Sequence, residues 1–176
     1  MILLIAGSSH TGKTVLARKL MERHHIPCFS IDHLKMGLIR SGQTALTPED
    51  DDALTDYLWP ILREMIKTAM ENGQSMIVEG CYIPHDWRKS FGPAYAPHIR
   101  CCWLIMTRRY IESHFVDIHA HACDAEQRLF DEIDVDELVR DNENNLAQCQ
   151  KYGSEFVLID ECYPENLEEI YDDPAV

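Results

Sequence analysis

Eight consecutive residues near the start of the chain have the types and spacing of a phosphate-binding loop. A glycine, four variable residues, a second glycine, a lysine and a threonine follow one another: Gly7, Ser8, Ser9, His10, Thr11, Gly12, Lys13 and Thr14. Glycine at both ends permits backbone conformations that a side chain would block, so amide groups can approach a phosphate closely. Lys13 would neutralise the β- and γ-phosphates of a nucleotide, and the Thr14 hydroxyl would be a ligand of Mg²⁺. The motif therefore predicts that these eight residues bind ATP together with Mg²⁺.

The loop lies between an apolar run and an amphipathic segment that would hold it in place. Residues 2–6 are apolar throughout, which is typical of a central parallel strand covered on both faces. Residues 13–24 predict a helix, whose N-terminus carries a partial positive charge that favours an anion. An ordinary glycine-rich turn is the alternative, but the fixed spacing of the motif between a strand and a helix counts against it.

Four further strands and several helices follow from the same kind of pattern. Strands are expected at residues 28–32, 75–79, 99–106 and 156–160, and helices at 33–40, 47–72, 85–91, from 108 onward, 135–153 and 165–171. Pro60 lies inside the longest helix, so we expect a kink or break near Trp59. Strands that alternate with helices imply a parallel sheet with right-handed crossovers. We therefore predict an α/β fold with three layers, α/β/α, and five parallel strands, in a single domain over residues 1–176.

Carboxylates stand where two of these strands are expected to end. Asp32 closes the second strand and Glu79 closes the third, and ligands of parallel sheets bind beyond the carboxyl ends of the strands. Asp32 is our candidate to bind an acceptor hydroxyl or to take its proton. Glu79 is our candidate for the shell around a metal ion that Thr14 binds. The alternatives are a helix cap for Asp32 and a simple turn at Glu79 and Gly80.

These residues resemble those of the P-loop kinases of the nucleoside-monophosphate kinase-like group, which includes adenylate kinase, shikimate kinase, chloramphenicol phosphotransferase and zeta toxin. The resemblance implies the strand order 2-3-1-4-5 and a small helical lid near residues 108–131. It implies catalytic roles for Lys13, Asp32, Arg108 and Arg109, and acceptor contacts from Asp32, Lys35, Glu79, Gly80 and Arg88. For one of the two arginines after the fourth strand, a surface charge facing Glu112 is the competing interpretation.

Three functions are compatible with this set of residues. The first is an ATP-dependent phosphotransferase that moves the γ-phosphoryl group to a hydroxyl of a small-molecule acceptor. The second is a nucleoside or nucleoside-monophosphate kinase, although residues 81–84 depart from the F-P-R run that follows the third strand in adenylate kinases. The third is a regulatory ATPase without an acceptor. The base-recognition element N-K-x-D of GTPases is absent from the sequence.

Charge and hydropathy limit the partners of the chain. Its formal net charge is −14, which argues against a protein that mainly binds nucleic acid. No apolar run approaches the length of a membrane span. We therefore expect a cytoplasmic protein whose partner is a small molecule. The sequence does not indicate an oligomeric state.

The seven cysteines include no C-x-x-C pair and are best interpreted as reduced thiols. A different possibility is a metal site at His119, His121 and Cys123. These three residues lack the spaced pairs of a structural zinc site, and no clear fourth ligand follows them.

Overall fold

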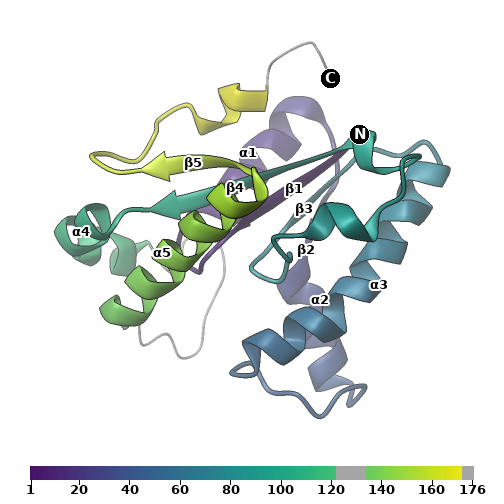
Figure 1. Cartoon of the computed structure of the whole chain (residues 1–176), viewed down its shortest axis with the longest axis horizontal. Coiled ribbons are helices and arrows are strands. Elements are labelled where there is room, and N and C mark those ends of the chain that lie inside the picture. Colours follow the sequence, from purple (N-terminus) through teal and green to yellow (C-terminus); the bar gives the residue numbers. More distant parts are fainter. Residues whose placement is uncertain (122–133, 172–176) are drawn as a thin grey trace.

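Five parallel strands form one sheet with helices on both faces in the computed structural model of the chain, which describes residues 1–121 and 134–171 (Figure 1). The strands are β1 (Ile2–Gly7), β2 (Cys28–Ser30), β3 (Met76–Glu79), β4 (Ile99–Met106) and β5 (Glu155–Ile159). The helices are α1 (Lys13–His24), α2 (Ile31–Arg40), α3 (Asp51–Glu71), α4 (Arg108–Ala120) and α5 (Val135–Tyr152), with 3-10 turns η1 (Trp87–Ser90), η2 (Ala96–His98) and η3 (Leu167–Tyr171). The strand order is β2-β3-β1-β4-β5, so the predicted fold class and strand order are confirmed.

Successive side chains of β1 point to opposite faces of the sheet, so the core has two layers, one on each face. Leu3 and Ile5 pack against Leu16 and Leu20 of α1 on one face of the sheet. Leu4 and its neighbours on the other face belong to a second cluster that includes the buried side of α3. Figure 1 shows α1 behind the sheet and α5 in front of it. Each fully buried leucine or isoleucine stabilises this arrangement by about 2 kcal/mol, and the strand at the centre holds the loop that follows it.

The carboxyl end of β2 differs from the prediction in one respect that matters for the site. β2 ends at Ser30, and Asp32 lies in the first turn of α2 instead of closing the strand. A carboxylate in the first turn interacts favourably with the helix dipole, and this explains why the helix begins before Asp32. Asp32 nevertheless stays at the edge of the sheet where the strands end.

The long helix α3 runs continuously through Pro60, so of the two predicted outcomes, a kink or a break near Trp59, the break is wrong. Pro60 lies on the exposed side of the helix. The carbonyl that loses its hydrogen bond there can be solvated instead, which lowers the cost of the proline. The helix also begins later than expected, at Asp51, because the Asp50 carboxylate accepts hydrogen bonds from the backbone and hydroxyl of Thr47 and closes a turn before it.

Two predicted short helices are single 3-10 turns, at η1 and η3. Of the predicted lid, α4 accounts for residues 108–120, and residues 122–131 lie outside the described part of the chain. None of the helices in the described ranges is both long and apolar enough to cross a membrane.

Gly80, directly after β3, lies close against Ile31 at the start of α2. Its φ is +155°, and a Cβ there would lie 2.8 Å from Cβ of Ile31. We expect Gly80→Ala to lower the free energy of unfolding by about 2 kcal/mol, because it combines backbone strain with overpacking. Denaturant titration measures the change.

Gly37 provides the matched control, since it lies inside α2 with nothing within 4 Å of an added Cβ. Gly37→Ala should stabilise the protein by up to about 1 kcal/mol. Equal effects of the two substitutions would contradict the close approach of α2 at Gly80.

Candidate active site

The phosphate-binding loop folds back on the carbonyl oxygen of Ser8. The Thr11 hydroxyl donates to this oxygen at 2.9 Å, and Nζ of Lys13 donates to it at 2.6 Å. Lys13 is only 6% exposed, so its ammonium group lies inside the loop rather than in solvent. Gly12, with φ of +85°, turns the backbone into α1. The loop therefore presents a lysine and the N-terminus of a helix to the same space, as anion binding requires.

Tyr163, in the segment after β5, covers the loop from outside. Its hydroxyl donates to the carbonyl oxygen of Thr11 at 3.2 Å, and a Cβ on Gly12 would collide with that hydroxyl. Burial raises the pKa of Tyr163 to about 12, so the hydroxyl stays protonated and remains a donor. Sequence reasoning missed this residue, because nothing in the local pattern connects it to a loop about 150 positions earlier.

A hydroxyl from the start of α1 and a carboxylate from the end of β3 meet beside the loop. Thr14 Oγ1 donates to Glu79 Oε2 at 3.2 Å, and Glu79 is 1% exposed. Ser30 pairs in register with Glu79, and its buried hydroxyl has no hydrogen-bond partner among the described residues. Hydroxyl and carboxylate oxygens are the donors that Mg²⁺ prefers, so this set fits that ion. Thr14 and Glu79 would hold Mg²⁺, which would neutralise charge on the phosphates of a nucleotide.

Asp32 and Lys35 are brought together on α2 as a salt bridge with a separation of 2.6 Å. Lys35 also donates to the Tyr82 hydroxyl at 3.0 Å, and that hydroxyl donates to Asp51 Oδ1 at 2.9 Å. Burial first, and then the nearby carboxylate of Asp51, raise the pKa of Tyr82 far above its usual value. The phenol therefore stays neutral and links α2, α3 and the segment after β3. The sequence had suggested Asp32 and Lys35, but not Tyr82 or Asp51 as their partners.

Asn145 of α5 is a second contact that the sequence did not reveal. Its amide nitrogen donates to Ser8 Oγ at 2.8 Å, and its oxygen lies 3.0 Å from Nε2 of His85. The ring of His85 stacks on that of Trp103, with centroids 3.9 Å apart and planes 12° apart. Burial lowers the pKa of His85 below its usual value, although hydrogen bonding to Asn145 and the charge of Asp86 oppose the shift.

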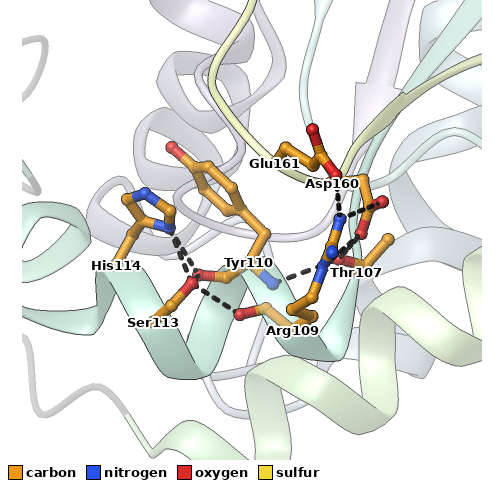
Figure 2. A network of polar contacts seen from close by, with 7 residues as sticks. All are labelled: Thr107, Arg109, Tyr110, Ser113, His114, Asp160 and Glu161. Carbon is orange, nitrogen blue, oxygen red and sulfur yellow. Dashed lines mark hydrogen bonds and ion pairs between the residues drawn. The ribbon is translucent and has the colours of Figure 1, made fainter.

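The two arginines after β4 reach different partners. Arg109 makes ion pairs with Asp160 and Glu161, which follow β5, and Thr107 donates its hydroxyl to the same Asp160 (Figure 2). The Thr107 hydroxyl also caps α4, because it accepts the backbone N–H of Tyr110. In Figure 2 this network ties the ends of β4 and β5 together. Arg109 therefore lies at the carboxyl edge of the sheet, where β4 and β5 end.

Arg108 instead contacts Glu112 on its own helix at 3.5 Å and Glu143 on α5 at 3.1 Å. The competing interpretation of a surface charge facing Glu112 thus describes the observed contact of Arg108. Arg88 is exposed in η1, with its guanidinium over the ring of Trp87, and no contact joins it to Asp32 or Lys35 within residues 1–121 and 134–171.

Only part of the suggested metal site at His119, His121 and Cys123 lies within the described residues. Cys123 lies outside the described residues, and within the described ones no group of three or more histidine, cysteine, aspartate or glutamate side chains could hold a metal ion.

No family model matches the sequence, and no curated protein matches it either. Solved structures do resemble the chain. A sugar kinase from a Janibacter species has a TM-score of 0.56 at 16% sequence identity, over 97% of this chain and 91% of that one. Shikimate kinase from Bacteroides thetaiotaomicron has a TM-score of 0.54 at 13% identity, over 98% of this chain and 93% of that one. The chain has the fold of the P-loop kinases. At these identities the likeness describes the fold, and the chemistry must be argued from the residues.

The lowered pKa of His85 predicts how stability depends on pH. As the pH falls below the usual histidine value of 6.5, the unfolded chain takes up a proton at this position that the folded chain does not. The unfolded state then binds more protons, so the free energy of unfolding decreases as the pH falls. We expect His85→Gln to lose less stability than the wild type between about pH 7 and about pH 5, as denaturant titrations at each pH would measure.

His98→Gln is the control, because His98 is exposed. It should keep the pH dependence of the wild type. If His85→Gln kept it as well, burial would not be holding His85 neutral.

Proposed function

We propose that this protein is an ATP-dependent phosphotransferase that moves the γ-phosphoryl group to a hydroxyl of a small-molecule acceptor. The observation that carries the proposal is the arrangement at one edge of the sheet. Lys13 and Thr14 begin α1 directly after the loop that follows β1, and Thr14 donates to Glu79, the last residue of β3. Asp32 lies in the first turn of α2, directly after the neighbouring strand β2. A kinase needs a group for the phosphates, a site for the metal and a carboxylate for the acceptor hydroxyl, and this edge provides all three.

The transfer assigns a separate task to each residue. Lys13 would leave the carbonyl of Ser8 and bind phosphate oxygens. The acceptor oxygen would form a bond to the γ-phosphorus while the bond from that phosphorus to the β,γ-bridging oxygen breaks, so that ADP leaves. Asp32 would accept the hydroxyl proton or orient the hydroxyl. Lys35, at 2.6 Å from the Asp32 carboxylate, would hold that carboxylate in a fixed direction.

The charges beside Asp32 favour an acceptor without a phosphate group. The charge of Lys35 is compensated by Asp32, and Asp51 adds a second carboxylate through Tyr82. Among the described residues, the cluster formed by Asp32, Lys35, Tyr82 and Asp51 thus contains two carboxylates and one ammonium group. A phosphorylated acceptor would be repelled there, because like charges at short range disfavour binding. We therefore favour an uncharged hydroxyl compound over a nucleoside monophosphate.

Replacing the carboxylate of Asp32 separates transfer from nucleotide binding. Asp32→Asn should lower the transfer rate by about a hundredfold or more, since the amide cannot accept the proton. Its affinity for ATP·Mg²⁺ should stay close to that of the wild type in a calorimetric titration. Asp56→Asn, at an exposed position of α3, controls for the loss of one negative charge. Full transfer activity in Asp32→Asn would refute the role of this residue.

The acceptor class can be tested by ADP release from ATP·Mg²⁺ over a panel of sugars, polyols, nucleosides and nucleoside monophosphates. We expect stimulation by an uncharged hydroxyl compound, and none by the monophosphates. Lys13→Ala is the blank, because it should lose both nucleotide affinity and turnover. A slow rate that no compound changes would favour the regulatory ATPase instead. Stimulation by a nucleoside monophosphate would overturn the choice of acceptor but not the kinase.

A further inference from the structure

Asn145 on α5 makes hydrogen bonds to the phosphate-binding loop and to His85, and the His85 ring stacks on Trp103 in the core of the sheet. Asn145 donates to Ser8, which is 137 positions away in the sequence, and meets His85, which is 60 positions away. Ser8 is 6% exposed, and Trp103, on which the His85 ring stacks, is 2% exposed. The transfer described above assigns no task to Asn145 or His85. Polar contacts between groups so distant in the sequence and partly buried call for an explanation.

The directions of the hydrogen bonds fix both side chains. The amide nitrogen of Asn145 faces Ser8, so its oxygen faces His85, and Nε2 of His85 must carry the hydrogen and donate it. The opposite nitrogen of the ring, Nδ1, is buried and has no hydrogen-bond partner among the described residues. The stack on Trp103 prevents the ring from turning away. His85 therefore holds the Asn145 amide in the one orientation that donates to the loop.

Ser8 is also the residue that Lys13 contacts. Its carbonyl accepts from the Lys13 ammonium and from the Thr11 hydroxyl. When a phosphate enters the loop, Lys13 must exchange this carbonyl for a phosphate oxygen, and Ser8 loses a charge-assisted hydrogen bond. The contact from Asn145 reaches the side chain of Ser8 and does not depend on Lys13. It can hold Ser8 in place during the exchange.

We propose that Asn145 and His85 are positioning residues that keep the phosphate-binding loop in its binding conformation before the nucleotide arrives. Asn145 acts on the loop directly, and His85 acts through Asn145. The inference rests on the proposed function only in taking a nucleotide phosphate as the ligand of the loop. A loop that is ordered in advance loses less conformational entropy on binding, so the effect should appear in affinity.

The first test compares Asn145→Ala with Asn144→Ala, its exposed neighbour on α5. Asn145→Ala should bind ADP·Mg²⁺ about tenfold more weakly in a calorimetric titration, the size expected for one lost hydrogen bond. Without nucleotide, the amides of residues 7–14 should exchange hydrogen faster in this variant. Asn144→Ala should match the wild type in both measurements.

The second test asks whether the residues act as one unit. Ser8→Ala should weaken ADP binding to the same extent, and the double variant with Asn145→Ala should be no weaker than either single variant. His85→Ala should behave like Asn145→Ala. His85→Gln should restore the affinity, because the glutamine amide can donate to Asn145 from a position close to that of Nε2.

Wild-type affinity and hydrogen exchange in Asn145→Ala would overturn the proposal, and so would effects of Ser8 and Asn145 that simply add. If Asn145→Ala does not fold, the comparison of His85→Ala with His85→Gln decides in its place. A wild-type protein that binds ADP but phosphorylates no acceptor would refute the kinase and leave these binding tests valid.

Discussion

The loop after β1 is packed so closely that two of its positions have no room for a side chain. A Cβ at Gly7 would collide with the carbonyl oxygen of Leu104 in β4, and one at Gly12 would collide with the hydroxyl of Tyr163. Both glycines also have positive φ angles, +141° and +85°. The loop is therefore confined by the central strand before it, the neighbouring strand β4 and the segment after β5. Its conformation depends on the whole sheet being assembled, because these contacts come from distant parts of the chain.

The two lysines near this edge of the sheet differ in their partners, and the difference separates their roles. Lys13 donates to a neutral carbonyl, whereas Lys35 is paired with the carboxylate of Asp32. A phosphate replaces a carbonyl readily, since the ammonium gains an anionic partner. It would have to compete with a carboxylate for Lys35. Of the two lysines, Lys13 is thus the one that can offer its charge to a nucleotide, while the charge of Lys35 serves to orient Asp32.

The sequence predicts the parts of the site that lie within one local pattern. The eight residues of the loop and the strand β4 follow from spacing and residue type. Asp32 was placed one element too early, because the sequence does not show that α2 begins directly after Ser30. Tyr163, Asn145 and His85 could not be predicted, since their contacts join segments brought together only by the strand order. Asn145 in particular lies in a polar helix where the sequence offers several equivalent asparagines.

The two arginines after β4 have exposed side chains, so their ion pairs differ from the buried contact of Lys13. The side chains of Arg108 and Arg109 are 52% and 59% exposed, so their ion pairs are screened by water and contribute little to stability. Such a pair can be exchanged for a phosphate at small cost. Arg108 is held by Glu143, which lies two residues before Asn145 on α5. If Arg108 turned toward a bound phosphate, α5 would lose this ion pair next to the point where the helix contacts Ser8. The stacked His85 would then be the contact that keeps Asn145 in place.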